Sequence, residues 1–465
     1  MSRTSPYLLS LLRVRGPAAL VALCGLPVLL WANALPLADR FRDSTTTFAS
    51  LAVVCSLVGV TSFALNLLLG ARIGFVNELF GGLSRMYGVH QVNGRIAYVS
   101  LLAHICLIAA SRATISMSDA LALFLPGTGW TVGLGELAFA GMTIAIGLTL
   151  FANMNHELFV YVQRSFGIIF VAASFHVFLT PGTKAYSSLL TGYLAILTCV
   201  ALAAFGYRSL FGSVLVRRHD YWVARAEALD SSVIEVTMTP KSDPLRFKPG
   251  QFVFLTFDSP AIERIFHPVD MASEGRSAVV SIRSGAVHNQ FHPFSITSAP
   301  DDPNLSVAVK AVGDYTTAMR VLEKGASARV EGPYGRFSHV DVDNRRQVWI
   351  AGGIGVTPFV SMARSLKGSE HEVDLYLGTK SVEQAYFAEE LSAAAQTGES
   401  LRVMVVPEDE AGFITAEYLD KHSGLSGKDI FICGPPAMID NLRNQFHERG
   451  VPDERVHYEL FSFLK

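Results

Sequence analysis

Three histidines in the first half of the chain stand within long apolar segments. His90 and His104 are fourteen positions apart, so one α-helix would carry both on the same face, about 21 Å apart along its axis. His176 lies near the end of a later apolar segment, at the depth of His104. Histidines within a membrane are costly and usually functional, and imidazoles at two depths suit the axial positions of two stacked haems. The pattern predicts that His104 and His176 bind one haem iron and that His90 binds at a second depth.

A first motif in the second half has the residue types that hold a flavin. In His292-Pro293-Phe294-Ser295 the phenyl ring offers a surface beside the isoalloxazine, and the Ser295 hydroxyl can reach flavin N5. His292 and Pro293 fix the end of the strand. The longer stretch HPFSITSAP (292–300) resembles the flavin-binding signature of the ferredoxin–NADP reductase superfamily. We therefore expect FAD beside this strand, with Ser295 as a catalytic residue.

A glycine turn further along the chain is predicted to bind the FAD pyrophosphate. In KAVGDYTTAMRVL (310–322) a helix starts after Gly313, and backbone N–H groups at a helix start attract anions. We expect those N–H groups and the Thr316 hydroxyl to be free for the phosphates, with Lys310 adding positive charge.

Two further loops predict a pyridine-nucleotide site. AGGIGVTPF (351–359) follows an apolar strand and precedes a helix, the context in which glycines let a nucleotide approach the backbone. Thr357 at the helix start would bind the nucleotide or cap an exposed N–H group. CGPPAM (433–438) lies at a later strand end, where nicotinamide would meet the flavin. The residues predicted to bind at these loops are Gly352, Gly353, Gly355, Thr357, Cys433, Gly434 and Pro435.

Three residues bear on catalysis and on cofactor choice. We interpret Cys433 as a packing residue that shapes the catalytic pocket rather than as a nucleophile, because no basic partner is near it in sequence. Lys380 follows the second strand, where a 2′-phosphate would lie, and it favours NADPH while leaving NADH open. Phe461 either covers the flavin face or docks with its terminal strand in the core.

Composition divides the 465 residues into two parts. Residues 1–212 contain 18 charged side chains and residues 213–465 contain 60, while the net charge of the whole chain is −2. The first part is therefore typical of a membrane protein, and the balance argues against nucleic acid as a partner. The five cysteines are too scattered for an iron–sulfur cluster or structural zinc.

Six apolar segments are long enough to cross a bilayer as helices. They lie near residues 17–37, 48–70, 93–111, 131–153, 165–180 and 187–210. The stretch 115–128 contains Pro126 and a glycine, and Gly129 follows it, which predicts a partly buried loop. With a cytoplasmic N-terminus, ten arginines fall on the inner side, against three arginines and Lys184 outside. This asymmetry predicts that both termini and the second half are cytoplasmic.

The second half changes to short β-rich segments and then to strand–glycine–helix units. Residues 233–238, 251–257 and 305–312 predict strands of a small barrel. From about residue 345 the repeating units predict a doubly wound parallel sheet. We expect a six-helix all-α membrane domain (1–212), an antiparallel β-barrel FAD domain (213–340) and an α/β NAD(P)-binding domain (341–465). The stretch 258–290 has no assigned purpose.

The whole pattern resembles the ferric reductase and NADPH oxidase superfamily of transmembrane haem reductases. RMYGVHQVNGRIAYVSLLAH (85–104) is similar to its first histidine pair, and HELFVYVQRSFGIIFVAASFH (156–176) to its second. Where the resemblance implies an inner histidine before Arg164, this chain has Gln163, and His156 lies about 10 Å nearer the cytoplasm. The sequence therefore predicts one haem, bound by His104 and His176, and leaves open whether a second, inner haem is present.

The resemblance implies an NAD(P)H-dependent oxidoreductase that passes electrons through FAD and haem b across the lipid bilayer to a small-molecule acceptor. Molecular oxygen and ferric iron both fit as acceptors, and Arg112, about 12 Å beyond His104, would attract an anion or hold a haem propionate. The alternative is a membrane protein with haem b that delivers electrons to quinone or to a partner protein.

Overall fold

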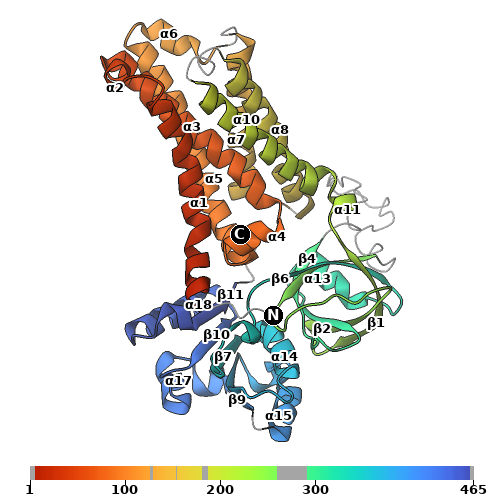
Figure 1. The fold of residues 1–465 in the computed structure, drawn as a ribbon. Coiled ribbons are helices and arrows are strands. Elements are labelled where there is room, and N and C mark those ends of the chain that lie inside the picture. Colours follow the sequence, from red (N-terminus) through yellow and green to blue (C-terminus); the bar gives the residue numbers. More distant parts are fainter. Residues whose placement is uncertain are drawn as a thin grey trace. The chain divides into compact units, whose positions relative to one another are not determined.

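The computed structural model describes residues 6–125, 129–152, 154, 156–180, 187–258, 291–398 and 400–460. It divides into two compact units, one of residues 7–216 and one formed mainly by residues 217–465 (Figure 1). We call them the membrane unit and the redox unit and describe each by itself.

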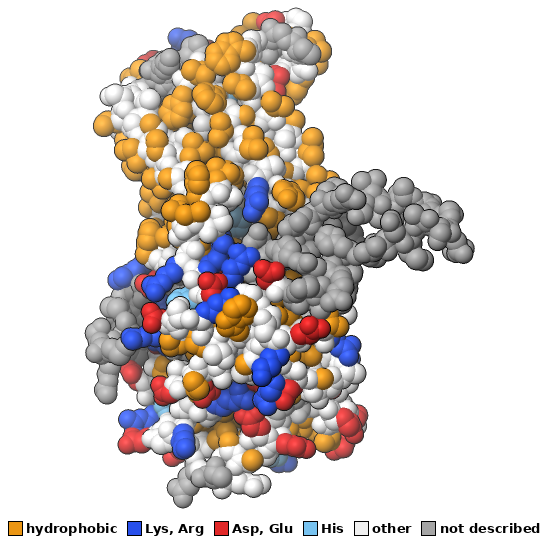
Figure 2. Space-filling model, turned by 90° about the vertical axis from the view of Figure 1, so that its right-hand side faces the viewer, with side chains coloured by type: hydrophobic (Ala, Val, Ile, Leu, Met, Phe, Trp, Pro, Cys, Tyr) orange, Lys and Arg blue, Asp and Glu red, His pale blue; other side chains and the backbone are white. Residues whose placement is uncertain are grey.

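The membrane unit contains six helices that are long and apolar enough to cross a membrane, which confirms the predicted number in the described residues. Apolar side chains dominate its visible face (Figure 2), and some point fully outward, such as Ile168 and Ile196, 73% and 68% exposed. The long helices are α1 (Pro6–Ala32), α3 (Ser44–Gly70), α5 (Leu83–Ala113), α7 (Trp130–Phe151), α8 (His156–Leu179) and α10 (Ser188–Phe205).

Short helices connect these spans. They are α2 (Leu37–Arg40), α4 (Gly74–Leu79), α6 (Met117–Ala122) and α11 (Gly212–Leu215), with a π-helical turn at Gly206–Leu210. The helix α6 corrects the prediction of a loop over 115–128, because residues 117–122 are helical and Ala120 is buried. Residues 117–122 pair their backbone groups within this helix instead of forming a loop.

The core of the membrane unit is built from one or two side chains of each of five helices. Phe63 of α3 and Phe170 of α8 meet edge to face, with ring centroids 5.1 Å apart. Small residues allow the helices to approach closely: a Cβ on Gly59 of α3 would lie 2.7 Å from the Leu101 side chain of α5. The buried cluster comprises Phe63, Ala64, Ala97, Met142, Phe170 and Ala201.

The redox unit begins with a six-stranded antiparallel sheet in the order β4-β3-β6-β1-β2-β5. A bridge between Ile296, which directly follows β4, and Val307 in β5 joins the two ends of this order, so the sheet curls round a core rich in valine. The strands are β1 (His219–Ala228), β2 (Val233–Pro240), β3 (Phe252–Asp258), β4 (His292–Ser295), β5 (Leu305–Lys310) and β6 (Ser327–Tyr334), with helix α13 (Asp314–Ala318) after β5.

A five-stranded parallel sheet follows, in the order β11-β10-β7-β8-β9. Alternate residues of β7 bury opposite faces: Trp349 packs with α14 and α15, while Val348 and Ile350 pack with α17 and α18. This two-sided cover confirms the doubly wound prediction. The elements are β7 (Arg346–Gly352), α14 (Thr357–Arg364), β8 (Glu372–Thr379), α15 (Ala388–Thr397), β9 (Leu401–Pro407), α16 (Glu408–Ala411), α17 (Ala416–Ser423), β10 (Asp429–Cys433), α18 (Pro436–Glu448) and β11 (Val456–Glu459).

Candidate functional site

The predicted flavin motif forms the whole of β4. Its register on β3 places Ser295 opposite Phe252 and Phe294 opposite Val253. Ser295 is buried, whereas His292, Pro293 and Phe294 are half-buried, so the motif presents partly accessible side chains along one short strand. Phe294 also packs against the barrel core, which holds its ring in place; its contact with an isoalloxazine stays a prediction.

Tyr315, which the sequence analysis missed, joins this strand to the phosphate turn. Its ring stacks on His292 with centroids 4.1 Å apart, and its hydroxyl accepts the Phe257 N–H at 3.2 Å. Burial raises the pKa of Tyr315, so the phenol stays neutral. Since Tyr315 belongs to α13, the two segments predicted to bind FAD lie together.

The phosphate turn differs from the prediction in its hydrogen bonds. The Thr316 hydroxyl accepts the N–H groups of Val312 at 2.9 Å and Gly313 at 3.0 Å, and it donates to the Gly313 carbonyl. These groups are therefore not free, because a threonine three positions after a helix start caps the turn itself. Lys310 ends β5 and is half-buried beside Val233. Binding of the pyrophosphate here stays a prediction.

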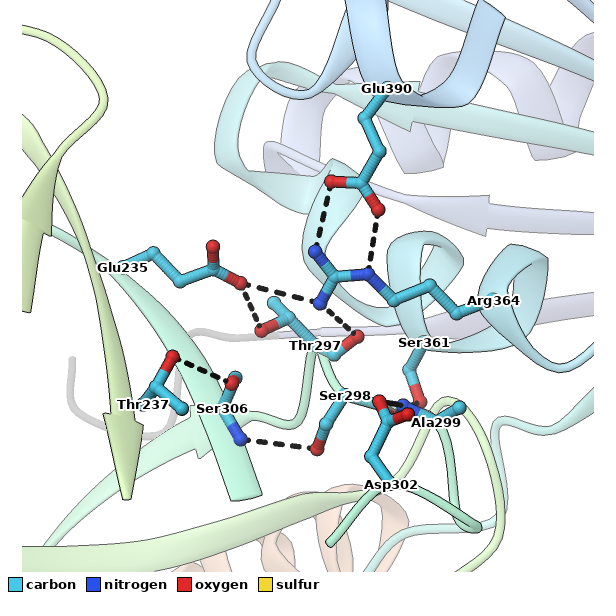
Figure 3. A network of polar contacts seen from close by, with 10 residues as sticks. All are labelled: Glu235, Thr237, Thr297, Ser298, Ala299, Asp302, Ser306, Ser361, Arg364 and Glu390. Atoms are coloured by element: carbon cyan, nitrogen blue, oxygen red, sulfur yellow. Dashed lines mark hydrogen bonds and ion pairs between the residues drawn. The ribbon is translucent and has the colours of Figure 1, made fainter. Parts of the chain in front are cut away.

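An ion-pair network secures the barrel to the parallel sheet just after the flavin motif (Figure 3). Arg364 of α14 donates to the Thr297 carbonyl at 2.9 Å and to Glu235 of β2 at 3.3 Å. It also binds Glu390 of α15 in a bidentate pair at 2.7 and 2.9 Å. Burial opposes the charge, but the two carboxylates outweigh it and hold the pKa of Arg364 above its ordinary value. The flavin strand is thus positioned against the nucleotide-binding helices.

The two predicted nucleotide loops lie in contact at the carboxyl ends of β7 and β10. A Cβ on Gly352 would lie 2.8 Å from Pro435, and one on Gly434 would lie 3.0 Å from the Gly352 Cα. Gly353 has φ +54°, a conformation that favours glycine, and a Cβ on Gly355 would collide with the Cys433 carbonyl. The glycines therefore serve first to bring the two loops together.

Thr357, the first residue of α14, is buried, and its hydroxyl donates to the Ile354 carbonyl at 3.0 Å. The sequence predicted that this hydroxyl binds the nucleotide or caps an exposed N–H group. The observed bond does neither, because its partner is a carbonyl. The bond instead stabilises the glycine loop before the helix.

Cys433 is fully buried and pairs in register with Glu459 on the neighbouring strand β11. Burial, and then the negative charge of Glu459, raise the pKa of the Cys433 thiol, so the thiol stays protonated and does not act as a thiolate. Glu459 was missed by sequence reasoning, although its place in the terminal strand, at the start of a Glu-x-aromatic pattern, was a usable signal. Its carboxylate approaches Gly335 of the barrel. Phe461 lies outside the described residues.

Lys380 follows β8 and is exposed. Its carbonyl accepts the Asp409 N–H at 3.4 Å, which brings the acidic helix α16, with Glu408, Asp409 and Glu410, next to the predicted 2′-phosphate position. Three acidic residues therefore begin next to Lys380 along the backbone, a feature that the sequence analysis did not weigh.

In the membrane unit, His104 and His176 are held in the same way. The Nδ1 of His104 lies 2.9 Å from the Ala52 carbonyl of α3, and the Nδ1 of His176 lies 2.8 Å from the Thr131 carbonyl of α7. Because a carbonyl only accepts, each Nδ1 carries the proton and each Nε2 keeps its lone pair. This is the tautomer that binds a metal through Nε2.

Gly135 of α7, also missed from the sequence, provides the space for His176. A Cβ at this position would lie 2.8 Å from His176 Nδ1. Among the described residues, no three His, Cys, Asp or Glu side chains gather as for a bare metal ion. Two imidazoles that each keep Nε2 as a lone-pair donor are nevertheless the ligands that a haem iron takes, so these residues fit that group.

His90 is held differently. Its Nδ1 is buried without a hydrogen-bond partner in the described part of the chain. Gln163 donates its amide to the Thr149 hydroxyl of α7 at 3.4 Å, and the His156 side chain lies outside the described set. The structure therefore shows no second pair like that of His104 and His176 within the residues it describes.

Comparison with known families covers all three parts of the chain. The model for the ferric reductase like transmembrane component matches residues 55–174, that for an FAD-binding domain matches residues 267–338, and that for the oxidoreductase NAD-binding domain matches residues 349–444. The chain therefore contains a membrane component, an FAD-binding domain and an NAD-binding domain.

Three relatives illustrate the range of similarity. A flavohemoprotein of Rhodopirellula baltica is 28% identical over 235 residues, 46% of this chain and 53% of the relative. A ferredoxin–NADP reductase of Sorangium cellulosum is 30% identical over 188 residues, 36% and 77% of the two chains. A heavy chain of the superoxide-generating NADPH oxidase of Dictyostelium discoideum is 31% identical over 157 residues, 30% and 19%. The chain thus spans about half the length of the first of these relatives.

Proposed function

We propose a transmembrane electron path for this chain, which belongs to the ferric reductase and NADPH oxidase superfamily. It is an oxidoreductase and a multi-pass membrane protein. Electrons would enter from NAD(P)H at the redox unit and leave through haem in the membrane unit to a small-molecule acceptor. FAD, when bound, takes a hydride and releases single electrons, which is what haem iron accepts.

At the redox unit, the residues of β4, β10 and β11 would orient the hydride transfer. Ser295 would donate its hydroxyl hydrogen toward the flavin, and the Cys433 thiol would shape the nicotinamide pocket by packing. Glu459, one strand away from Cys433, would place a carboxylate beside the reacting rings. The contact between the Gly352 and Gly434 loops supports a nucleotide bound across these strand ends, where ligands bind in doubly wound sheets.

The observation that carries the proposal is the matched orientation of His104 and His176. Each imidazole donates to a carbonyl of its neighbouring helix and keeps Nε2 as a lone-pair donor. Such bonds fix the ring and increase its basicity toward iron. His104 and His176 would therefore hold one low-spin haem b, which we call the His104–His176 site.

We infer that both termini and the redox unit are cytoplasmic. The arginine-rich connections of the membrane unit lie on the side of the N-terminus when six spans alternate, and cytoplasmic loops carry the excess of Lys and Arg. The His104–His176 site would then be near the outer leaflet, and the acceptor would be molecular oxygen or a ferric complex.

A second candidate is a membrane protein with haem b that reduces quinone or a partner protein. It is favoured by Gln163, which donates to the Thr149 hydroxyl and stands where a second histidine would be needed to pair with His90. A chain with one haem would suit a short path to a membrane-soluble acceptor better than a path across the bilayer.

The deciding experiment is a reduced-minus-oxidised spectrum of the purified chain with haem quantified per FAD. We expect a low-spin b-type spectrum that His104→Ala and His176→Ala each abolish while FAD remains bound. Flavin without any haem in the wild type would refute the proposal. Oxygen, a ferric chelate and a quinone analogue are then offered as acceptors to the NADPH-reduced protein.

Cofactor choice is tested with Lys380→Asp. If Lys380 binds the 2′-phosphate, the variant loses affinity for NADPH more than for NADH, because attraction becomes repulsion. Equal losses would show that Lys380 is only a solvated surface charge.

A further inference from the structure

The backbone that follows the flavin strand is held by a closed set of hydrogen bonds (Figure 3). Thr297, two residues after Ser295, is fully buried, and its carbonyl accepts a hydrogen bond from Arg364 Nη1 at 2.9 Å. The Thr297 hydroxyl donates to Glu235 at 3.0 Å, and the same Glu235 oxygen accepts from Arg364 Nη1 at 3.3 Å. One guanidinium of the nucleotide-binding domain therefore holds both the chain next to the flavin motif and the barrel strand β2.

A second bond joins the same helix to the next residue of that chain. The Ser361 hydroxyl donates to the Ser298 carbonyl at 2.7 Å, and both residues are buried. Ser361 and Arg364 are three positions apart, so they share one face of α14. The helix begins at Thr357, directly after the glycine loop 352–356. One helix of eight residues, about 12 Å long, thus carries the predicted nucleotide loop at its start and holds the flavin backbone along its length.

Arg364 also contacts the segment that follows the predicted 2′-phosphate position. Its bidentate partner Glu390 lies in the first turn of α15, and its guanidinium carbon is 5.9 Å from the centre of the Phe387 ring, which precedes that helix. Phe387 has φ +62°, a conformation that is uncommon for a bulky residue and persists where the surroundings hold it. The segment from Lys380 to α15 therefore ends against the same guanidinium that holds the flavin backbone.

These contacts are suited to fixing distances more than to adding stability. Ion pairs near a protein surface contribute little to the free energy of unfolding. Two of the groups that α14 binds are the main-chain carbonyls of Thr297 and Ser298, so the bonds fix the position of the chain itself. Hydride transfer needs its reacting atoms about 3–3.5 Å apart, and a misplacement of about 1 Å can slow a reaction about 100-fold.

We propose that Arg364 is a positioning residue for hydride transfer from NAD(P)H to FAD. By holding the Thr297 carbonyl and Glu235, it sets the spacing between the flavin strand and the nucleotide loop of α14. This inference rests on the proposed function. In the step, the C–H bond at nicotinamide C4 breaks, and its electron pair and hydrogen form the N–H bond at flavin N5. NAD(P)H is thereby oxidised to NAD(P)⁺ and FAD is reduced to FADH⁻. Arg364 exchanges no proton and acts only through the chain that it holds.

The test is single-turnover flavin reduction in the full chain in detergent, followed by stopped-flow absorbance over a range of NADPH concentrations. For Arg364→Gln we expect the maximum rate to fall about 10- to 100-fold, while the NADPH concentration for half-saturation changes little, because the glycine loops are intact. The long-wavelength charge-transfer absorbance between NADP⁺ and reduced flavin should weaken, since it requires stacked rings. Arg364→Lys keeps a cation that can donate to the Thr297 carbonyl, so it should be faster than Arg364→Gln.

Arg402→Gln is the matched control. It removes an ion pair with Asp374 inside the nucleotide-binding domain. Asp374 pairs with Val348 in the first half of β8, whereas Gly378 at the carboxyl end pairs with Gly352 of the nucleotide loop. The control therefore loses an arginine–carboxylate pair of the same domain without touching the barrel, and it should keep the wild-type rate and charge-transfer band.

A wild-type maximum rate and band in Arg364→Gln would overturn the inference while leaving the electron path standing. An equal loss in Arg402→Gln would overturn it as well, because the rate would then follow stability. Should Arg364→Gln fail to bind FAD, Glu235→Gln decides: a lower maximum rate at unchanged half-saturation supports the inference, and a wild-type rate overturns it. A wild type without FAD, or with flavin that neither NADPH nor NADH reduces, would instead refute the proposed function.

Discussion

Ser295 combines burial with a position at the end of the flavin strand. It is 6% exposed and lies opposite Phe252 on β3, so its hydroxyl is held by the sheet rather than by a mobile loop. A side chain in this setting contributes a hydrogen bond without losing much further conformational entropy. We therefore expect the removal of this hydroxyl to affect flavin reduction more than folding.

For Ser295→Ala we expect NAD(P)H-driven flavin reduction to slow by about 10- to 100-fold, the effect of one lost hydrogen bond of about 1.5–3 kcal/mol. Stopped-flow absorbance of the flavin measures the rate, with Ser298→Ala as a control on the following loop. FAD content should be unchanged. Full-speed reduction in Ser295→Ala would remove this residue from the site.

His339 makes the stability of the redox unit depend on pH. Its ring is 1% exposed between Trp349 and His371, and burial, together with the His371 charge, lowers its pKa to about 3. The unfolded chain binds this proton below about pH 6.5 and the folded chain does not. The free energy of unfolding is therefore not reduced by His339 above about pH 6.5, and it falls as the pH is lowered from there toward 3.

The expected loss is about 1.4 kcal/mol per pH unit within that interval. Thermal unfolding of the full chain in detergent between pH 5 and pH 7.5 measures it, and His339→Gln should flatten the dependence even if its stability at pH 7.5 is lower. Parallel curves for wild type and variant would show that other groups cause the acid sensitivity.

At the scale of elements, the membrane helices hold their histidines through neighbours rather than through their own sequence. Gly135 on α7 leaves space for the His176 ring, because it has no Cβ. Ala52 on α3 contributes its backbone carbonyl, which accepts the hydrogen bond of His104. Each contact depends on the relative shift of two helices along their axes. A shift of one residue would move the carbonyl out of reach.

Gly135→Ala should therefore displace the His176 ring and reduce haem occupancy at least several-fold. Gly133→Ala is the matched control on the same helix, because a Cβ there meets nothing within 4 Å. The haem-to-protein ratio of the two variants, compared with wild type, measures the effect. Equal occupancy in both would mean that the ring relocates without losing its ligand role.

These elements also show what sequence can and cannot predict here. Six apolar stretches and the glycine-rich strand ends are local signals, so the spans, the barrel strands and the doubly wound sheet were foreseeable. The Thr316 cap, the pairing of Cys433 with Glu459 and the carbonyl behind His176 were not. The Thr316 cap results from a competition among local hydrogen bonds. The Cys433–Glu459 pairing and the carbonyl behind His176 depend on the register between segments far apart in the chain.

For the whole molecule, the proposed electron path across the bilayer depends on how many haems the chain binds. The His104–His176 site has two matched imidazoles, whereas Gln163 faces Thr149 of α7. An amide oxygen is a poor ligand for ferric haem beside an imidazole. A single haem would leave a long gap to the opposite side of the membrane and would limit turnover.

Gln163→His should then add a second low-spin haem and raise the rate of acceptor reduction several-fold. Pyridine haemochrome assay gives the haem count, and electron paramagnetic resonance gives the spin state. Gln163→Asn is the control, since it keeps an amide. Two bis-imidazole haems in the wild type would contradict this expectation and would direct attention to His156 as a ligand.

The bonds that hold His104 and His176 also bear on how the protein is made. Each histidine is fixed within its own pair of consecutive long helices, α3 with α5 and α7 with α8. The first pair precedes the second in the chain, so it is synthesised first. If His104 and His176 hold one haem, as proposed, the haem would be the link between the two helix pairs, and its insertion would complete the assembly of the bundle. Haem starvation should then leave the two pairs unlinked and lower the amount of the protein in the membrane.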